Sequence, residues 1–299
     1  MQETRGAAPL PAVLAAFAVI YLVWGTTYLA NRVVVEVLPP LLSRAACCLA
    51  AGAILVAAAR LRGAPASCAA EWRAAALTGP LLFVGCQGLL SVTQRHVASG
   101  LAALVIATVP LWIPLFAWAA PGGRAPARAV LGGAALGLSG VAVLVGGAGA
   151  LGGMRPVWGA ALLLSALSWA AGTVLNRHLP RPASPLLGAG MGLLAGGAAL
   201  VLCGAVAGEA AGPWPEAVPP AVWGALAYTV FCNYLLAFGC YVWLLDVRPA
   251  ERVATYAYVN PLVAVLVGWL FAGEPLTAGV GVAAALIVGA VAVAVSRGA

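Results

Sequence analysis

The sequence predicts an all-α polytopic membrane protein whose ten transmembrane helices form two inverted five-helix repeats. Three observations predict this class. Hydrophobic residues make up 64% of the 299-residue chain and charged residues only 8%, whereas a soluble domain carries roughly 25% charged residues. Apolar stretches of about 20 residues, the length that crosses a bilayer as a helix, follow one another along the whole chain. The motif W-x6-N-R occurs twice, from Trp24 to Arg32 and from Trp169 to Arg177.

Arginine, proline and glycine residues mark the ends of ten apolar spans. Lipid offers the backbone no hydrogen-bond partner, so each span is expected to be a helix. The first span follows a short N-terminal lead and could mimic a signal peptide, but it carries Trp24, Tyr28 and Asn31 and recurs later in the chain, so we expect it to be retained. The predicted spans cover residues 11–31, 38–59, 72–92, 97–119, 128–148, 157–176, 184–207, 219–245, 250–272 and 277–296.

The arginines predict the orientation of the spans, and all 15 basic residues are arginine. With the N terminus in the cytoplasm, eleven arginines fall in cytoplasmic segments, three fall in outer connections, and Arg44 lies within a span. Basic residues accumulate on the cytoplasmic side, so both termini are expected there. The eleven are Arg5, Arg60, Arg62, Arg73, Arg124, Arg128, Arg177, Arg181, Arg248, Arg252 and Arg297, and the three are Arg32, Arg95 and Arg155.

Several other classes of protein are disfavoured. The net charge of +7 comes from scattered single arginines without a basic stripe, which argues against a nucleic-acid partner. Seven cysteines show no C-x-x-C pair, and His96 and His178 stand alone, so no metal and no cofactor are expected. An intramembrane enzyme needs a nucleophile–base pair, a carboxylate dyad or a metal set at membrane depth. Neither H-E-x-x-H nor G-x-S-x-G is present, and we expect no enzyme.

The repetition extends beyond the first motif. P-L-L at residues 40–42 recurs at 185–187, with the same offset of 145 as Trp24 and Trp169, and Pro110 corresponds to Pro261. Five spans per half make the second half enter the membrane from the opposite side, which is the architecture of many alternating-access transporters. Similarity of composition alone is the alternative interpretation. The two halves are expected at residues 1–148 and 149–299.

Four stretches resemble the EamA-type drug/metabolite transporters: AVIYLVWGTTYLANR, VLPPLL, ASGLAALVIATVPLW and TYAYVNPLVAVLVGWLFAGEPLT. The resemblance covers nearly the whole chain and implies ten helices in two EamA repeats, with efflux of metabolites or amino acids through the inner membrane. Its motifs specify the family well and the substrate poorly. The chain departs from the family pattern at Cys47, where an arginine is common, at Gln94, where glutamate is common, and at Gly123, which replaces the acid of the second half's GEPL.

Polar side chains inside apolar spans indicate a candidate substrate cavity, because each needs a partner or a water-lined surface. Trp24, Tyr28 and Asn31 share one helix face, although hydrogen bonding between packed helices is the alternative. Tyr256 and Asn260 lie one turn apart, next to a helix proline. Tyr241 is expected in the interfacial aromatic belt. The candidate cavity residues are Trp24, Thr27, Tyr28, Asn31, Arg44, Gln87, Ser91, Thr108, Trp112, Trp169, Asn176, Asn233, Tyr256 and Asn260.

Arg44 has two interpretations. Facing the cavity, it is a natural anchor for a substrate carboxylate. Near the membrane surface, it extends to the outer headgroups, and its place four residues after Pro40 favours this second interpretation.

Together these features predict a carrier that binds a small metabolite, such as an amino acid, and exports it by alternating access. A channel or scaffold is the alternative. No Asp or Glu lies in mid-span, so export with weak or no ion coupling is expected. The expected partners are the substrate and the lipid bilayer. Gly133-x3-Gly137 and Gly192-x3-Gly196 permit close helix contact within the chain or across a homodimer.

Overall fold

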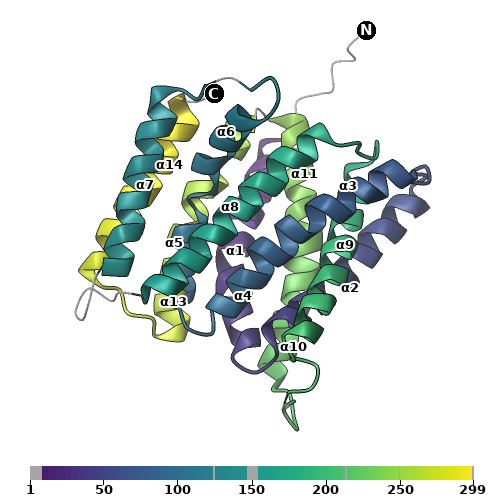
Figure 1. Cartoon of the computed structure of the whole chain (residues 1–299), viewed down its shortest axis with the longest axis horizontal. Helices are drawn as coiled ribbons and strands as arrows, with labels where there is room; N and C mark the ends of the chain where they lie inside the picture. The colour runs from purple at the N-terminus through teal and green to yellow at the C-terminus, as the bar shows by residue number, and fades with distance from the viewer. Residues whose placement is uncertain (1–8, 124, 147–153, 213, 249, 298–299) are drawn as a thin grey trace.

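The computed structural model describes residues 9–123, 125–146, 154–212, 214–248 and 250–297, and it confirms the predicted fold class. The predicted junction at 148/149 lies outside the described residues, as do Arg5 and Arg124. The elements are α1 Leu10–Val35, α2 Pro40–Leu61, α3 Ala69–Gly79, η1 Pro80–Gly88, α4 Leu89–Thr93, α5 Ser99–Ile106, α6 Val109–Ala119, α7 Arg128–Gly146, α8 Pro156–His178, α9 Pro185–Val206, α10 Pro220–Ala227, η3 Tyr228–Ala237, α11 Phe238–Val247, α12 Ala250–Val253, α13 Tyr256–Ala272 and α14 Ala278–Arg297 (Figure 1).

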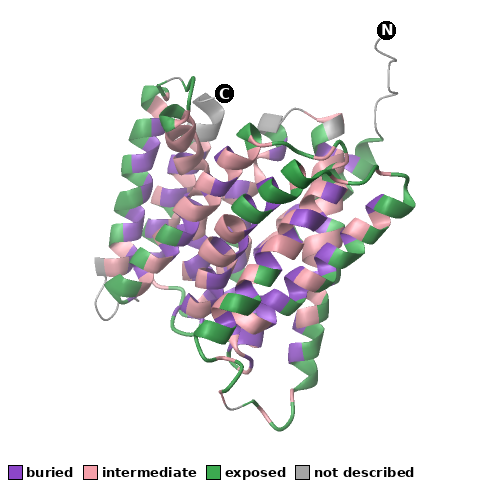
Figure 2. Cartoon of the chain, turned by 45° about the vertical axis from the view of Figure 1, so that its right-hand side comes forward, coloured by how far each residue is buried: buried purple, intermediate pink, exposed green. Residues whose placement is uncertain are grey.

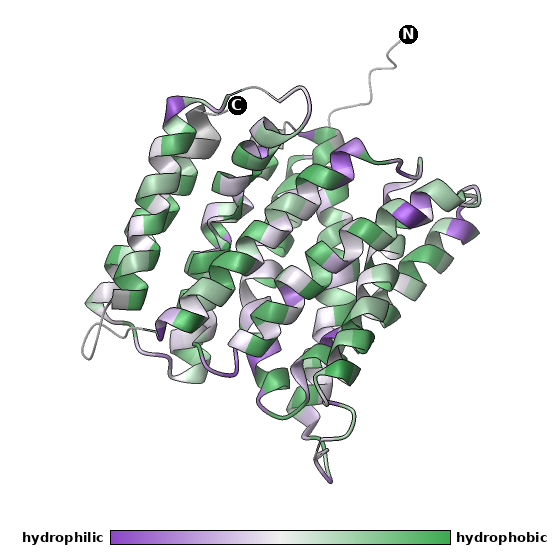
Figure 3. Ribbon diagram, in the orientation of Figure 1, coloured by the Kyte–Doolittle hydropathy of each residue, from purple (hydrophilic) through white to green (hydrophobic). Residues whose placement is uncertain are grey.

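The outer surface of the bundle suits lipid. Eight segments of the described chain are long and apolar enough to cross a membrane, and two shorter apolar helices at Tyr256–Ala272 and Ala278–Val293 bring the total to the predicted ten. Large hydrophobic side chains such as Leu202 and Phe271 are 68% and 78% exposed. Figure 2 shows exposed residues on the outward sides of the helices, and Figure 3 shows hydrophilic residues gathered at helix ends and connections.

The two ends of the described chain lie on one side of the bundle. Figure 1 shows that α1 begins and α14 ends at the same face, which we call the terminus face. The opposite face, which we call the far face, carries the connections after α1, α4, α9 and α13.

Helices of the first half (α1–α7) pack mainly against helices of the second half (α8–α14). Helix α2 lies along α9, and α7 lies along α14. Helix α1 contacts η3 and α13, while α8 contacts η1 and α6, which is the same arrangement with the halves exchanged. Small residues permit this closeness: a Cβ on Gly52 would lie 3.0 Å from the carbonyl oxygen of Gly190.

Both halves interrupt their helices in corresponding spans. The third and eighth spans each contain a π-helical segment, η1 and η3, a feature that often occurs at functional sites. The fourth span breaks at residues 107–108 and the ninth at 254–255. Pro110 lies in the first turn of α6, whereas Pro261 lies inside α13. Discontinuous helices of this kind supply binding groups in many transporters.

Two of the glycines in the predicted contact motifs approach other parts of the same chain. A Cβ on Gly137 would lie 2.6 Å from Cδ1 of Leu111, and a Cβ on Gly196 would lie 2.5 Å from Cδ2 of Phe83. These two glycines therefore let side chains of the same chain approach their helices.

Candidate functional site

A cavity of about 1190 Å³ lies between helices of both halves. It reaches the terminus face, because Arg177, Arg181 and Ser184 at the α8–α9 connection line it. Among the described residues of the far-face connections, only Gln94 lines it. The cavity is therefore open toward the terminus face and ends in a floor before the far face.

Most of the predicted cavity residues do line this cavity. Three do not: Ser91, Thr108 and Trp112. The Thr108 hydroxyl donates to the carbonyl of Val105 at 2.7 Å, and Trp112 Nε1 donates to Thr108 Oγ1 at 2.9 Å. The break before α6 turns this face toward α7, where the Thr108 methyl group lies 3.9 Å from a Cβ placed on Gly137. The lining residues among those predicted are Trp24, Thr27, Tyr28, Asn31, Arg44, Gln87, Trp169, Asn176, Asn233, Tyr256 and Asn260.

Arg44 lies at the floor and is 3% exposed. Its Nε donates to Ser91 Oγ at 3.3 Å, its Nη1 to Tyr234 Oη at 3.4 Å, and its Nη2 to Asn31 Oδ1. The favoured expectation that Arg44 extends to the outer headgroups is therefore wrong. The reason is that the α9–α10 connection covers the start of α2: the Glu209 carboxylate accepts the backbone N–H groups of residues 41 and 42.

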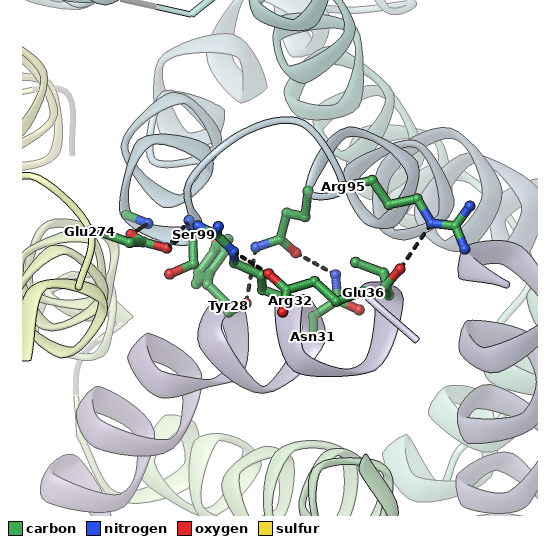
Figure 4. A network of polar contacts seen from close by, with 10 residues as sticks. Tyr28, Asn31, Arg32, Glu36, Arg95, Ser99 and Glu274 are labelled. Atoms are coloured by element: carbon green, nitrogen blue, oxygen red, sulfur yellow. Dashed lines mark hydrogen bonds and ion pairs between the residues drawn. The ribbon is translucent and has the colours of Figure 1, made fainter. Parts of the chain in front are cut away.

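Amide side chains complete the floor. Asn31 Nδ2 donates to Gln94 Oε1, and Gln94 Nε2 donates to the carbonyl of Tyr28 at 2.9 Å. Ser91 Oγ donates to Asn31 Oδ1 at 3.2 Å from behind the cavity wall. Gln94 was not predicted as a site residue, although its polar side chain at the end of an apolar span was the available signal. Figure 4 shows Tyr28 and Asn31 on the same helix within this network of polar contacts.

An aromatic cluster of Trp24, Tyr241 and Tyr256 forms the wall nearer the terminus face. Ring centroids are 4.8 Å apart for Trp24 and Tyr256, 5.4 Å for Trp24 and Tyr241, and 5.9 Å for Tyr241 and Tyr256. All three line the cavity, so the assignment of Tyr241 to the interfacial belt is wrong. Because the cavity opens at this face, a residue near the end of its helix still faces the cavity interior.

Asn260 lies beside this cluster on α13 and is 8% exposed. With its amide nitrogen turned toward the neighbouring carbonyls, it donates to Tyr256 O and Tyr21 O, both at 3.3 Å. It thereby joins α13 to α1 at the cavity wall.

A carboxylate seals the far face below the floor. Glu274, 7% exposed, accepts the backbone N–H groups of Ser99 at 2.6 Å and Gly100 at 3.0 Å, and its Oε1 lies 2.7 Å from Arg32 Nη1 (Figure 4). An anion at the N-terminal end of α5 satisfies unpaired N–H groups and interacts favourably with the helix dipole. We call Arg32, Ser99, Gly100 and Glu274 the far-face seal.

Two glycines shape the backbone around Glu274 and leave room for its carboxylate. Gly273 ends α13 with φ of 62°, in the left-handed region that favours glycine. A Cβ on Gly268 would lie 2.3 Å from Glu274 Oε2, so glycine also leaves room for the carboxylate. The corresponding turn of the first half has a similar glycine, Gly122 with φ of 75°, followed by Gly123 in place of the acid. In the described residues, the acid of this seal is therefore present at the far face and absent from the corresponding turn of the first half.

Formal charges in the cavity are mostly positive. Arg177 and Arg181 line its mouth and Arg44 its floor, whereas Glu71, in the first turn of α3, is the acid among the lining residues. Within the described part of the chain, no three His, Cys, Asp or Glu side chains gather as a metal site would require. The arrangement suits binding of a small molecule at an amide- and guanidinium-lined floor between aromatic walls.

The chain resembles known proteins in sequence and in fold. Residues 10–146 and 157–296 each match the EamA-like transporter family. The inner membrane transporter YedA of Escherichia coli is 37% identical over 273 residues, covering 90% of this chain and 85% of YedA, and the transporter YvbV of Bacillus subtilis is 28% identical over 272 residues, covering 89% and 85%. A protein of known crystal structure has a TM-score of 0.62 at 25% identity, covering 96% of this chain and 98% of that one.

Proposed function

Because the chain belongs to the EamA-like transporter family, we propose that it is a secondary-type carrier that exports small metabolites, amino acids among them, by alternating access. The observation that carries this proposal is a cavity between the two halves that is open to the terminus face and closed at the far face. Alternating access requires a central site that communicates with one side at a time.

The orientation proposed for the carrier has both termini in the cytoplasm, because eleven of its arginines then lie on the cytoplasmic side. The terminus face is then the cytoplasmic face, and this conformation opens inward. Export would begin by loading substrate from this side. The far-face seal would then have to open while the walls near Arg177 and Arg181 come together.

A channel is the alternative, and the far-face seal argues against it. A channel needs a continuous path in its conducting state, and its selectivity commonly comes from rings of charge or carbonyl groups. Here the floor and the seal form two successive closed layers, Asn31 with Gln94 and then Arg32 with Glu274.

Counterflow in liposomes tests the carrier proposal. Purified protein is reconstituted with an internal excess of one unlabelled compound, and uptake of the labelled compound is followed for a panel of amino acids, amines, organic acids and sugars. A carrier gives a saturable overshoot, and Asn260→Ala lowers it because that side chain joins two cavity helices. Ser139→Ala is the matched control, since its hydroxyl bonds only to Leu136 O on the outside of α7. A linear, non-saturating leak would favour the channel.

Coupling to protons is proposed to be weak. The acid among the lining residues, Glu71, lies at the cytoplasmic mouth, where its carboxylate accepts the N–H of Cys68 at 2.9 Å. An intramembrane carboxylate is the usual proton carrier of coupled antiporters. Imposing a pH gradient on the counterflow assay is expected to change initial rates less than twofold. A change of tenfold would show that protons are coupled.

A further inference from the structure

Arg44 is a buried cation, and the described residues place no buried anion beside it. The guanidinium is 3% exposed, and both ion pairs among the described residues belong to Arg32. An unpaired charge in a protein interior is strongly disfavoured unless a counter-charge arrives. The position of Arg44 on the cavity lining means that such a counter-charge can arrive from the cavity.

The hydrogen bonds of Arg44 leave donors for that counter-charge. A guanidinium has five N–H donors, and the protein accepts three of them, through neutral oxygens of Asn31, Ser91 and Tyr234. One N–H on Nη1 and one on Nη2 are left. Two N–H groups of one guanidinium are what a carboxylate accepts in a bidentate pair. The bonds to Ser91 and Tyr234, at 3.3 and 3.4 Å, are also long.

Among the described residues, the cavity offers no equivalent group for an ammonium. In the described part of the chain, its charged lining residues are Arg44, Arg177, Arg181 and Glu71, and their formal charges sum to +2. Glu71 is at the mouth, in the first turn of α3, and its carboxylate is already bonded to a backbone N–H. An ammonium carried into the interior by a zwitterion would therefore lack a carboxylate partner.

Apolar surface lies directly beside Arg44. Tyr234, which accepts from Arg44, has its ring centroid 6.4 Å from that of Phe83, and Phe83 lies 6.4 Å from Trp169. All three line the cavity. Farther out, the aromatic cluster begins at Trp24, seven residues before Asn31 on α1 and roughly 10 Å along the helix axis. A ligand anchored at Arg44 thus lies between apolar walls.

From these observations we infer that the cavity binds organic carboxylate anions with an apolar body, and that it prefers them to zwitterions and cations of the same skeleton. Arg44 holds the carboxylate, and the rings hold the body. This inference rests on the proposed carrier function, because it names the substrate class of the same cavity.

Three compounds with one skeleton test this preference: 3-phenylpropionate, phenylalanine and phenethylamine. Each is titrated calorimetrically into the full-length protein in nanodiscs of phosphatidylcholine, which excludes anionic headgroups as competitors. We expect 3-phenylpropionate to bind at least tenfold more tightly than phenylalanine and phenethylamine to bind least. Equal or tighter binding of phenylalanine or phenethylamine would overturn the inference, and so would the absence of binding by 3-phenylpropionate. This comparison uses only the unmodified protein.

Variants then assign the effect to Arg44. Arg44→Gln is expected to weaken binding of 3-phenylpropionate at least tenfold, and Arg44→Lys to give an intermediate loss, because it keeps the charge without the bidentate geometry. The matched control is Arg177→Gln, which removes one cationic group at the exposed mouth and is expected to weaken binding less than threefold. Equal losses in Arg44→Gln and Arg177→Gln would mean that net charge, and not Arg44, selects the ligand.

The counterflow assay separates this inference from the carrier proposal. Saturable counterflow of neutral or zwitterionic compounds without binding of the anion would overturn the substrate class and leave the carrier intact. Binding of the anion together with a non-saturating leak would support the anion site and overturn the carrier.

Discussion

Glu274→Gln is expected to increase the population of the conformation that is open at the far face. The substitution keeps the size of the side chain and one oxygen acceptor. It removes the negative charge that faces Arg32 Nη1 at 2.7 Å and that accepts the N–H groups of Ser99 and Gly100 at 2.6 and 3.0 Å. A glutamine amide presents an NH2 group to one of these donors, so one of the two backbone bonds is lost.

The magnitude follows from these contacts. A hydrogen bond to a charged group contributes about 1.5–3 kcal/mol, and one such bond is lost. The Arg32 side chain is 29% exposed, so its pair with Glu274 adds only about 1 kcal/mol. A total of about 3 kcal/mol raises the population open to the far face roughly a hundredfold. This estimate holds as long as that state stays the minor one.

Accessibility of a single cysteine measures that population. Ala103→Cys places a thiol on the cavity lining, one turn inside the start of α5, after the seven native cysteines have been replaced by serine. A membrane-impermeant maleimide added at the far face should label the Ala103→Cys protein roughly a hundredfold faster when Glu274→Gln is also present. The matched control is Glu36→Gln: Glu36 contacts the same Arg32, at 2.9 Å, but its side chain is 54% exposed.

An exposed ion pair contributes about 0.2–1 kcal/mol, so Glu36→Gln should raise the labelling rate less than about fivefold. Equal rates for the two variants, or no increase in Glu274→Gln, would refute the idea that the carboxylate holds the far face closed.

Three further outcomes are expected. Gly25→Ala should lower the thermal midpoint of the purified protein, because its Cβ would lie 2.6 Å from Cβ of Val263 and overpacking costs about 1–3 kcal/mol. Gly281→Ala on α14 should leave the midpoint unchanged, because a Cβ there has nothing within 4 Å. Equal shifts in the two variants would contradict the packing argument. Gly273→Ala should give a far-face labelling rate between those of the wild type and Glu274→Gln, because the left-handed conformation at φ of 62° costs alanine roughly 1–2 kcal/mol. An unchanged labelling rate would show that the turn tolerates a side chain. A green fluorescent protein fused to the C terminus should fluoresce in intact cells, and a periplasmic reporter that is active there would reverse the orientation.

The positions of the spans could be predicted because composition alone determines them. The expected span 38–59 corresponds to α2, Pro40–Leu61. The expected span 250–272 begins where α12 begins and ends where α13 ends. The interruptions were not predictable in the same way. The helix break at 254–255 falls six residues before Pro261, not at it. The π-helical segments η1 and η3 lie within apolar spans that the sequence predicts only as helices.

The site could be predicted best where one helix face carries several of its residues. Trp24, Tyr28 and Asn31 share a face of α1, and periodicity places them together on the cavity lining. How deeply a side chain is buried, and whether the cavity reaches it, depend on other parts of the chain. Arg44 is enclosed because Glu209 covers the start of α2, and Tyr241 faces the cavity because the opening lies at its end of the helix.

The pairing of α2 with α9 and of α7 with α14 also constrains how the protein is made. When the first five spans have entered the membrane, the faces of α2 and α7 that will meet those partners are still turned toward lipid. Gly52 and Gly140 then lack the second-half groups that fill the space above them. The first half therefore has no finished tertiary structure to adopt during synthesis. The face of α7 that packs on α14 is covered only once α14 is inserted, so truncation of that helix would leave α7 without its main partner in an otherwise inserted chain.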